Sequence, residues 1–225
     1  LQKLALALFT HEQGRQRLVS LDWAAESLVG FMPTTEKGRV KQHAEYFLRD
    51  EMVDSGIIVR RDNALEFWHL SFQEYLAAYE IAGRVEKEQD KLLFEKERIF
   101  SPEWRETVLL LAGILHKQGV NKVNQLVGLI LQHTPKGREA ELLPQQARSV
   151  ALLGGIQNDL RTLDYKPENK AHDAVINRVE GIFDSKTFRT VPAAVRCQAA
   201  DALAVAGDPR FNKIEWINMP GGEFC

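Results

Sequence analysis

Ile57-Ile58-Val59-Arg60 is followed by Arg61-Asp62-Asn63-Ala64 and then by Leu65-Glu66-Phe67-Trp68-His69. The first and third segments are short and rich in β-branched or aromatic residues, which favour strands. The middle segment is polar and contains Asp and Asn, which are typical of a tight turn. We therefore predict a β-hairpin over residues 57–69.

Three helices are predicted before the hairpin. Residues 1–10 carry apolar side chains at helical spacing, and a second helix is expected over residues 21–31 with Ser20 as its N-cap. The third helix covers about residues 37–53 and ends before Gly56. Three helices followed by a hairpin is the element order of a winged helix, so the sequence predicts such a module at the start of the chain.

A further helix is expected directly after the hairpin. Ser71 and Glu74 fit a capping box, in which each side chain satisfies a free backbone N–H of the first turn. A stripe of large apolar residues follows the helical period and is expected to face the core. Its members are Phe72, Tyr75, Leu76 and Tyr79. Gln73 lies off this stripe and is expected to point outward.

Beyond residue 83 the pattern is helical almost to the end. The charged segment 84–98 is expected to be a solvated connector, and the helix after Ser101-Pro102 is apolar nearly all round, which is typical of a central helix. Further helices are expected over residues 121–133, 145–160, 169–183 and 193–206. Helices joined by short turns, without strands, favour an α-solenoid. The predicted fold class is mainly α: a winged helix with a short β-hairpin, followed by an α-solenoid.

The composition indicates no charged partner and no membrane span. The 225 residues carry a formal net charge of -2, with 44% hydrophobic and 27% charged residues. No apolar run approaches the ~20 residues that cross a bilayer, and no signal peptide is visible. Cys197 and Cys225 form no CxxC pair, which indicates reduced thiols. We therefore expect a cytoplasmic protein.

The segment Phe67-Trp68-His69-Leu70-Ser71-Phe72-Gln73-Glu74-Tyr75-Leu76-Ala77-Ala78 resembles the F-x-H-x-S-F-Q-E-Y-x-A-A signature that closes the winged helix of NACHT-type signalling NTPases. Ser101-Pro102-Glu103-Trp104-Arg105-Glu106, followed by an apolar run, resembles the helical region after it. The resemblance implies a non-catalytic regulatory and scaffolding segment. Such a segment couples the nucleotide state of its own upstream NTPase core to a helical sensor or interaction region.

Two shorter resemblances lie nearer the C-terminus. Arg196, Ala199-Ala200, Ala202-Leu203 and Gly207-Asp208-Pro209-Arg210 are similar to a HEAT-type repeat. Residues 216–224, at the end of a strand expected over residues 214–219, resemble the opening of a formylglycine-generating-enzyme-like domain. The expected domains are a winged helix over 1–83, a helical region with HEAT-like repeats over 84–212, and the start of a further domain over 213–225.

His69 is the candidate site residue. In the resembled family the histidine of this motif lies at the β-phosphate of the nucleotide and helps to hold the closed, ADP-bound state. A histidine suits this role because it donates a hydrogen bond to an anion and gains charge near pH ~6.5. The alternative is a histidine stacked on Trp68 or hydrogen-bonded locally. Gln73, if outward, is expected to touch the NTPase core.

The chain lacks the motifs of nucleotide hydrolysis. It contains no G-x-x-x-x-G-K-[ST] loop and no Walker B acidic cluster. We expect no enzyme activity and no cofactor here, and ATP or ADP with Mg²⁺ in the full-length protein, which is expected to be an ATPase. The family resemblance also implies oligomerisation on activation, binding of a protein or ligand to the helical surface, and a role in bacterial defence.

Two alternative functions stay open. A winged helix can read DNA through its third helix, but acidic residues oppose the basic ones there and phosphate binding needs net positive charge. Nucleic acid is therefore not expected. The other alternative is a linker region of an enzyme whose activity lies in the C-terminal domain.

The six histidines are scattered and form no HxxxH or HExxH pair, so no metal site is expected.

Overall fold

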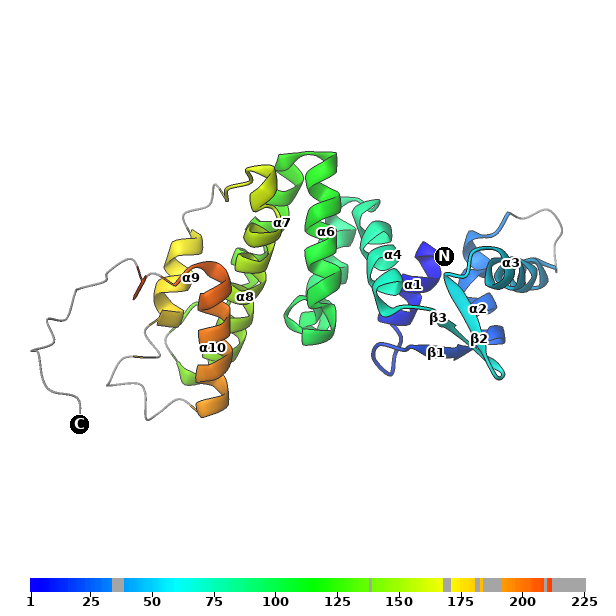
Figure 1. Ribbon diagram of the computed structural model, residues 1–225, viewed down its shortest axis with the longest axis horizontal. Helices are drawn as coiled ribbons and strands as arrows, with labels where there is room; N and C mark the ends of the chain where they lie inside the picture. The colour runs from blue at the N-terminus through cyan, green and yellow to red at the C-terminus, as the bar shows by residue number, and fades with distance from the viewer. Residues whose placement is uncertain are drawn as a thin grey trace, which may run out of the picture. The chain divides into compact units, whose positions relative to one another are not determined.

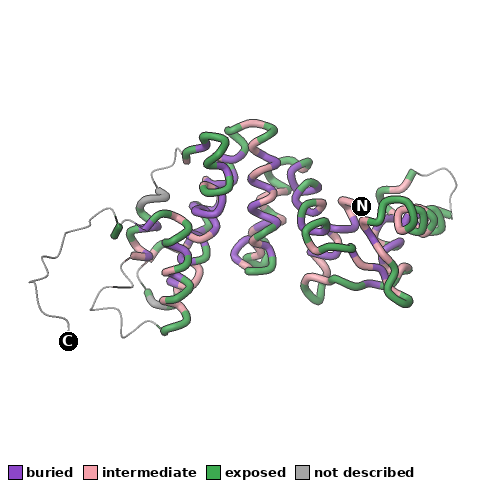
Figure 2. Tube along the Cα trace, viewed as in Figure 1, coloured by how far each residue is buried: buried purple, intermediate pink, exposed green. Residues whose placement is uncertain are grey.

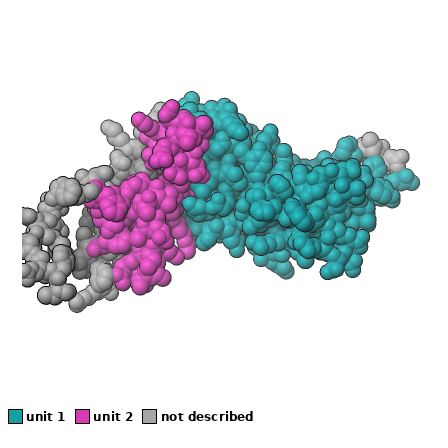
Figure 3. All heavy atoms as spheres, in the orientation of Figure 1, with its two compact units in different colours: residues 1–129 teal, residues 130–225 magenta. Residues whose placement is uncertain are grey.

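The computed structural model of the chain describes residues 1–33, 39–137, 139–167, 171–180, 183, 192–208 and 210–211. The chain divides into two compact units, Leu1–Leu129 and Ile130–Cys225 (Figure 3). Most of the described residues are helical, and a small three-stranded sheet lies in the first unit. The expected domain boundaries after residues 83 and 212 stay predictions.

The first unit begins with a winged helix (Figure 1). Its elements, in chain order, are α1 (Gln2–Phe9), β1 (Leu18–Ser20), α2 (Leu21–Leu28), the 3-10 turn η1 (Val29–Phe31), α3 (Val40–Asp54), β2 (Ile58–Arg61) and β3 (Ala64–Phe67). The strands are antiparallel in the order β1-β3-β2. Val19 of β1 faces Leu65 of β3, and Val59 of β2 faces Glu66. The predicted hairpin is confirmed as β2–β3, whereas β1 was not predicted.

Local chemistry explains where these elements begin and turn. The Ser20 hydroxyl accepts a hydrogen bond from the backbone N–H of Trp23 at 3.1 Å, so the predicted N-cap of α2 is confirmed. The hairpin turn places Asp62 at a φ of 53°, a conformation that Asp adopts more readily than most residues. Strand alternation directs Leu65 and Phe67 of β3 into the core.

Helices make up the rest of the first unit. They are α4 (Leu70–Ala82), α5 (Glu86–Phe94), η2 (Glu95–Phe100), η3 (Pro102–Trp104), α6 (Arg105–Gln118) and the greater part of α7 (Val120–His133). α4 packs against both α1 and α6. α6 is the central helix that its sequence predicts, because its apolar positions are buried on several sides (Figure 2). They include Val108, Leu109, Leu111, Ala112, Ile114 and Leu115.

All the secondary structure among the described residues of the second unit is helical. Its elements are η4 (Ala140–Leu142), α8 (Leu143–Asp159), η5 (Arg161–Leu163), α9 (Ala171–Glu180) and α10 (Ala193–Ala206). α8 packs along α10, and α9 contacts both. The helices predicted in this region are therefore confirmed, while their identity as HEAT-like repeats stays a prediction. The strand expected over residues 214–219 and the motif at 216–224 lie outside the described residues.

Gly154 lies at a close approach of α8 and α10. A Cβ atom built on Gly154 would lie 2.4 Å from the Cα and 2.5 Å from the backbone nitrogen of Ala206. Real side chains do not approach main-chain atoms so closely, so the two helix backbones meet here only because the residue is glycine.

Asp208, just after α10, carries an ion pair that ties it to Arg210. Its Oδ1 accepts hydrogen bonds from the backbone N–H and the Nε of Arg210, each at 2.9 Å. Hydrogen bonding to this guanidinium lowers the pKa of Asp208 below its ordinary value of 3.8. The folded state then binds the proton less tightly than the unfolded chain does. The pair therefore stabilises the fold above about pH 4, and this contribution is lost as the pH falls through the lowered pKa.

Asp208→Asn is expected to lower the free energy of unfolding at pH 7 by about 1 kcal/mol. The loss is modest because the Arg210 side chain is 41% exposed and solvent screens the pair. Urea denaturation followed by circular dichroism at pH 7 and pH 3 measures it. The difference between variant and wild type should shrink at pH 3, and an equal difference at both pH values would contradict this assignment.

Candidate functional site

His69 lies at the junction between the sheet and α4. It is the N-cap residue of α4, with φ -131° and ψ 141°, and its ring is exposed. Its Nδ1 accepts a hydrogen bond from the backbone N–H of Ser71 at 3.3 Å and lies 2.7 Å from the Ser71 Oγ. The ring also contacts Phe72 edge-on, with 6.3 Å between centroids. The local hydrogen bond that the sequence offered as an alternative for His69 is therefore present.

The cap determines which ring nitrogen of His69 carries the proton. Because Nδ1 accepts the Ser71 N–H, the neutral imidazole is protonated at Nε2. The Ser71 hydroxyl can donate to the same Nδ1. The Nε2–H is then a hydrogen-bond donor on an exposed ring, beside the positive end of the α4 dipole. Local hydrogen bonding and anion binding thus use different nitrogens and do not exclude each other.

The predicted capping box of Ser71 and Glu74 is wrong. α4 begins at Leu70, so its cap is His69. Glu74 instead lies against the loop between α1 and β1, where its Oε1 accepts a hydrogen bond from the Nη2 of Arg15 at 3.0 Å. A guanidinium that reaches a carboxylate makes a stronger, charge-assisted bond than a single backbone N–H does. Local spacing cannot reveal a partner 59 residues away in the chain.

Gln73 is also placed differently from the prediction. Its side chain is 1% exposed, so it does not point outward. Its Nε2 donates a hydrogen bond to the backbone carbonyl of Gln16 at 2.9 Å. Gln73 and Glu74 together hold the α1–β1 loop against α4. The physical reason is that Gln73 and Glu74 are buried and need polar partners, and this loop supplies them.

Arg15 is a residue that sequence reasoning missed, and it joins the two motifs of the sequence. Besides Glu74, its Nη1 donates to the backbone carbonyl of Glu103 at 3.1 Å, and its guanidinium lies 4.1 Å from the centroid of the Phe9 ring. Phe9 packs edge-on against Trp104, with 5.2 Å between centroids. The first motif at 67–78 is thereby tied to the second at 101–106. An isolated Arg in a polar loop gave no signal of this in the sequence.

Glu80, the second carboxylate of α4, also points inward. It is 6% exposed and pairs with Lys3 of α1 and with the Nη2 of Arg84, the latter at 3.3 Å. Both acidic side chains of α4 are therefore used for contacts inside the first unit.

The other side of α4 is aromatic and exposed. Phe72, Tyr75 and Tyr79 are 41%, 43% and 47% exposed, and Trp68 just before the helix is 65% exposed. The prediction that Phe72, Tyr75, Leu76 and Tyr79 form the core stripe is wrong, because Leu76 is only half-buried and the others face solvent. The buried apolar positions of α4 are Ala77, Ala78, Ile81 and Ala82. These mostly small residues let α4 lie close to α1 and α6, where large rings do not fit.

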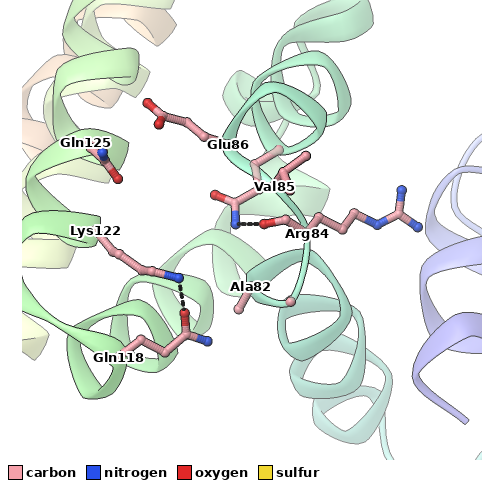
Figure 4. A pocket seen from close by; sticks show the side chains of 9 residues that line it. Ala82, Arg84, Val85, Glu86, Gln118, Lys122 and Gln125 are labelled. Carbon is pink, nitrogen blue, oxygen red and sulfur yellow. Dashed lines mark hydrogen bonds between the residues drawn. The ribbon is translucent and has the colours of Figure 1, made fainter.

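A hollow of about 520 Å³ lies in the first unit, between the end of α4 and the α6–α7 turn (Figure 4). Amide side chains and Lys122 line it, and the Lys122 Nζ donates to the Gln118 Oε1 at 2.7 Å. The guanidinium of Arg84 points away from Lys122 and Gln125. Lys122 is the one cation that points into the hollow, and the Glu86 carboxylate also lines it, so the hollow offers little to hold phosphate. Among the described residues no group of three or more His, Cys, Asp and Glu side chains is placed to hold a metal ion.

Basic side chains around α3 and the hairpin are partly neutralised. Lys41 pairs with Asp22 at 2.6 Å and with Glu26 at 3.2 Å, and the hydrogen bonds that its ammonium donates to these carboxylates raise the pKa of Lys41. Arg61 pairs with Glu66 at 2.5 Å. These pairs reduce the positive charge that the winged helix presents to a nucleic acid backbone.

None of the helices in the described ranges combines the length and the apolar character that a membrane span requires.

Comparison with known proteins relates the winged helix to one family of domains. Residues 1–81 match the family model of the winged helix-turn-helix domain C-terminal to NACHT. The matched span contains Arg15, His69 and the aromatic side of α4, and it supports the NACHT resemblance of this part of the chain. No finding supports the formylglycine-generating-enzyme-like domain. The comparisons with curated proteins and with solved structures gave no match.

Proposed function

We propose that this chain is a non-catalytic regulatory segment of a NACHT-type NTPase, in which His69 contacts the β-phosphate of ADP held by the NTPase core. The match of residues 1–81 to a winged helix that is C-terminal to NACHT supports an NTPase core as the partner of this segment. The observation that carries the role of His69 is its exposed ring, whose Nδ1 is engaged by Ser71 so that Nε2–H is the free donor of the neutral ring.

The surroundings of His69 favour an anion. The ring caps the N-terminus of a 13-residue helix, where unpaired backbone N–H groups and the helix dipole attract negative charge. Phosphate groups bind at such helix ends in many proteins. His69 offers one contact only, so the core supplies the other groups that hold ATP or ADP with Mg²⁺.

Arg15 offers a route from the nucleotide to the helices behind the winged helix. It bonds Glu74 on the second turn of α4 and the carbonyl of Glu103 in η3, just before α6. A change in the position of α4 therefore strains contacts to η3. The proposed switch has two packings of the winged helix, and nucleotide favours one of them. The helical surface then presents a site for a protein or ligand, and activation leads to oligomerisation.

His69→Ala in the full-length protein is expected to speed ADP dissociation by roughly tenfold, because it removes one charge-assisted hydrogen bond of about 1.5 kcal/mol. The rate is measured with a fluorescent ADP analogue chased by unlabelled ADP. His69→Asn is the matched variant, because Asn caps a helix well but lacks the imidazole.

The two variants separate sensing from capping. If His69 senses phosphate, both variants release ADP faster, while only His69→Ala lowers the melting temperature. If release is normal in His69→Asn, His69 acts only as a cap and the proposed sensor role is wrong.

A further inference from the structure

Another hollow, of about 210 Å³, lies inside the first unit between α2, α3 and the β2–β3 hairpin. We call it the hairpin hollow. Arg49 of α3 and Arg60 of β2 line it, together with the amide side chain of Asn63 in the hairpin turn. Its described lining residues include no acidic side chain. The hollow at the end of α4 differs, because the Glu86 carboxylate lines it together with Lys122.

The two arginines of the hairpin hollow carry positive charge that no carboxylate neutralises within the described part of the chain. The neighbouring cations Lys41 and Arg61 both pair with carboxylates. The Arg60 Nε instead donates a hydrogen bond to the backbone carbonyl of Asp62 at 2.7 Å. This bond holds the guanidinium in place and leaves its two Nη groups available to a ligand. The hairpin hollow is therefore suited to an anion.

We infer that the hairpin hollow binds a small phosphate monoester that carries an apolar group. A guanidinium matches a phosphate in geometry, because its parallel N–H groups bond two oxygens at once. At pH 7 a phosphate monoester carries a charge of about -1.5 to -2, which two arginines balance. A carboxylate carries a single charge and would leave one arginine unbalanced. The Asn63 amide adds a neutral donor at the same place.

The rest of the hairpin hollow is apolar, which requires an apolar group on the ligand. Side chains from α2, α3 and β3 supply this lining, namely Leu21, Met52, Ala64 and Leu65. Burial of a ring or a short aliphatic chain there adds to the binding free energy. Pockets for drug-sized ligands measure about 300–1,000 Å³, so the ligand of this smaller hollow is smaller than a nucleotide. The inference is therefore independent of the proposed contact of His69 with ADP.

Isothermal titration calorimetry of the 225-residue chain tests the inference with three probes at one ionic strength. The probes are phenyl phosphate, inorganic phosphate and benzoate, and phenyl phosphate should bind tightest. Inorganic phosphate lacks the ring and should bind roughly tenfold more weakly. Benzoate lacks the second charge and should also bind more weakly. If phenyl phosphate did not bind, or if either other probe bound as tightly, the assigned ligand class would be wrong.

Arg49→Gln and Arg60→Gln should each weaken the binding of phenyl phosphate by roughly tenfold, because each removes a charge-assisted hydrogen bond. Both side chains are exposed, so the variants should fold, which circular dichroism checks. Arg61→Gln is the matched control, because Arg61 also lies in β2 but pairs with Glu66 and is not a lining residue. It should bind like the wild type. Equal weakening in all three variants would show only a general attraction to the hairpin and would overturn the inference.

Two further probes distinguish the sources of the phosphate. If the ligand is a free metabolite, a phosphotyrosine peptide should bind no more tightly than phenyl phosphate. If it is a phosphorylated protein side chain, the peptide should bind more tightly, and either result agrees with the inference. A short DNA duplex that binds tightly and displaces phenyl phosphate would assign the two arginines to a nucleic acid surface. That result would overturn the inference.

Discussion

Arg15→Ala is expected to lower the free energy of unfolding by about 3 kcal/mol or more, as breaking a buried ion pair does. The side chains of Arg15 and Glu74 are only 10% and 11% exposed, so solvent screens their interaction little. Removing the guanidinium leaves the Glu74 carboxylate buried without its cation. It also removes the hydrogen bond to Glu103 and the contact with the Phe9 ring. Urea denaturation of the whole chain, followed by circular dichroism, measures the loss.

Lys41→Ala is the matched control for Arg15→Ala. It also deletes a cation that pairs with carboxylates, but Lys41 and Asp22 are 37% and 75% exposed. An exposed pair contributes little to stability, because solvent screens it. Arg15→Met combined with Glu74→Gln should recover much of the stability, because it leaves no unpaired buried charge. If Arg15→Ala lost no more than Lys41→Ala, the pair would not be a structural link between α4 and the α1–β1 loop.

Gly154→Ala is expected to destabilise the second unit by about 1–3 kcal/mol, the usual cost of overpacking. The added methyl group would lie 2.4 Å from the Cα and 2.5 Å from the backbone nitrogen of Ala206. Main-chain atoms cannot rotate away as a flexible side chain can, so α8 and α10 must separate. Gly154→Val should cost more, because its branched side chain is larger. Thermal unfolding of the chain by calorimetry is the measurement.

Gly128→Ala is the control for Gly154→Ala, since Gly128 also lies in a helix. A Cβ on Gly128 meets no atom within 4 Å, so alanine should stabilise α7 by up to about 1 kcal/mol through its helix propensity. Adding Ala206→Gly to Gly154→Ala should restore little, because it removes only the Ala206 Cβ and leaves the main-chain clash. Wild-type stability in Gly154→Ala would show that α8 and α10 do not meet at this point.

Features that depend on neighbours in the chain were predictable from the sequence. The hairpin at 57–69 was predicted from β-branched residues around a polar turn, and the Ser20 cap was predicted from a side chain that bonds three residues ahead. α6 was predicted as a central helix because apolar residues surround it. The motif at 67–78 placed His69 at a winged helix that follows NACHT, in agreement with the family match. β1 was missed because a three-residue strand carries too little pattern.

The sequence by itself thus determined that residues 70–82 form a helix, but it did not determine which side of that helix is buried. Large rings predicted one buried side, and the structure buries the other. Only the tertiary structure supplies the partners that decide this, namely Arg15, Gln16 and Lys3, which satisfy Glu74, Gln73 and Glu80. Polar groups can be buried at little cost when residues from elsewhere in the chain contact them and complete their hydrogen bonds. A narrow space beside α1 and α6 then accepts alanines and leaves the aromatic rings outside.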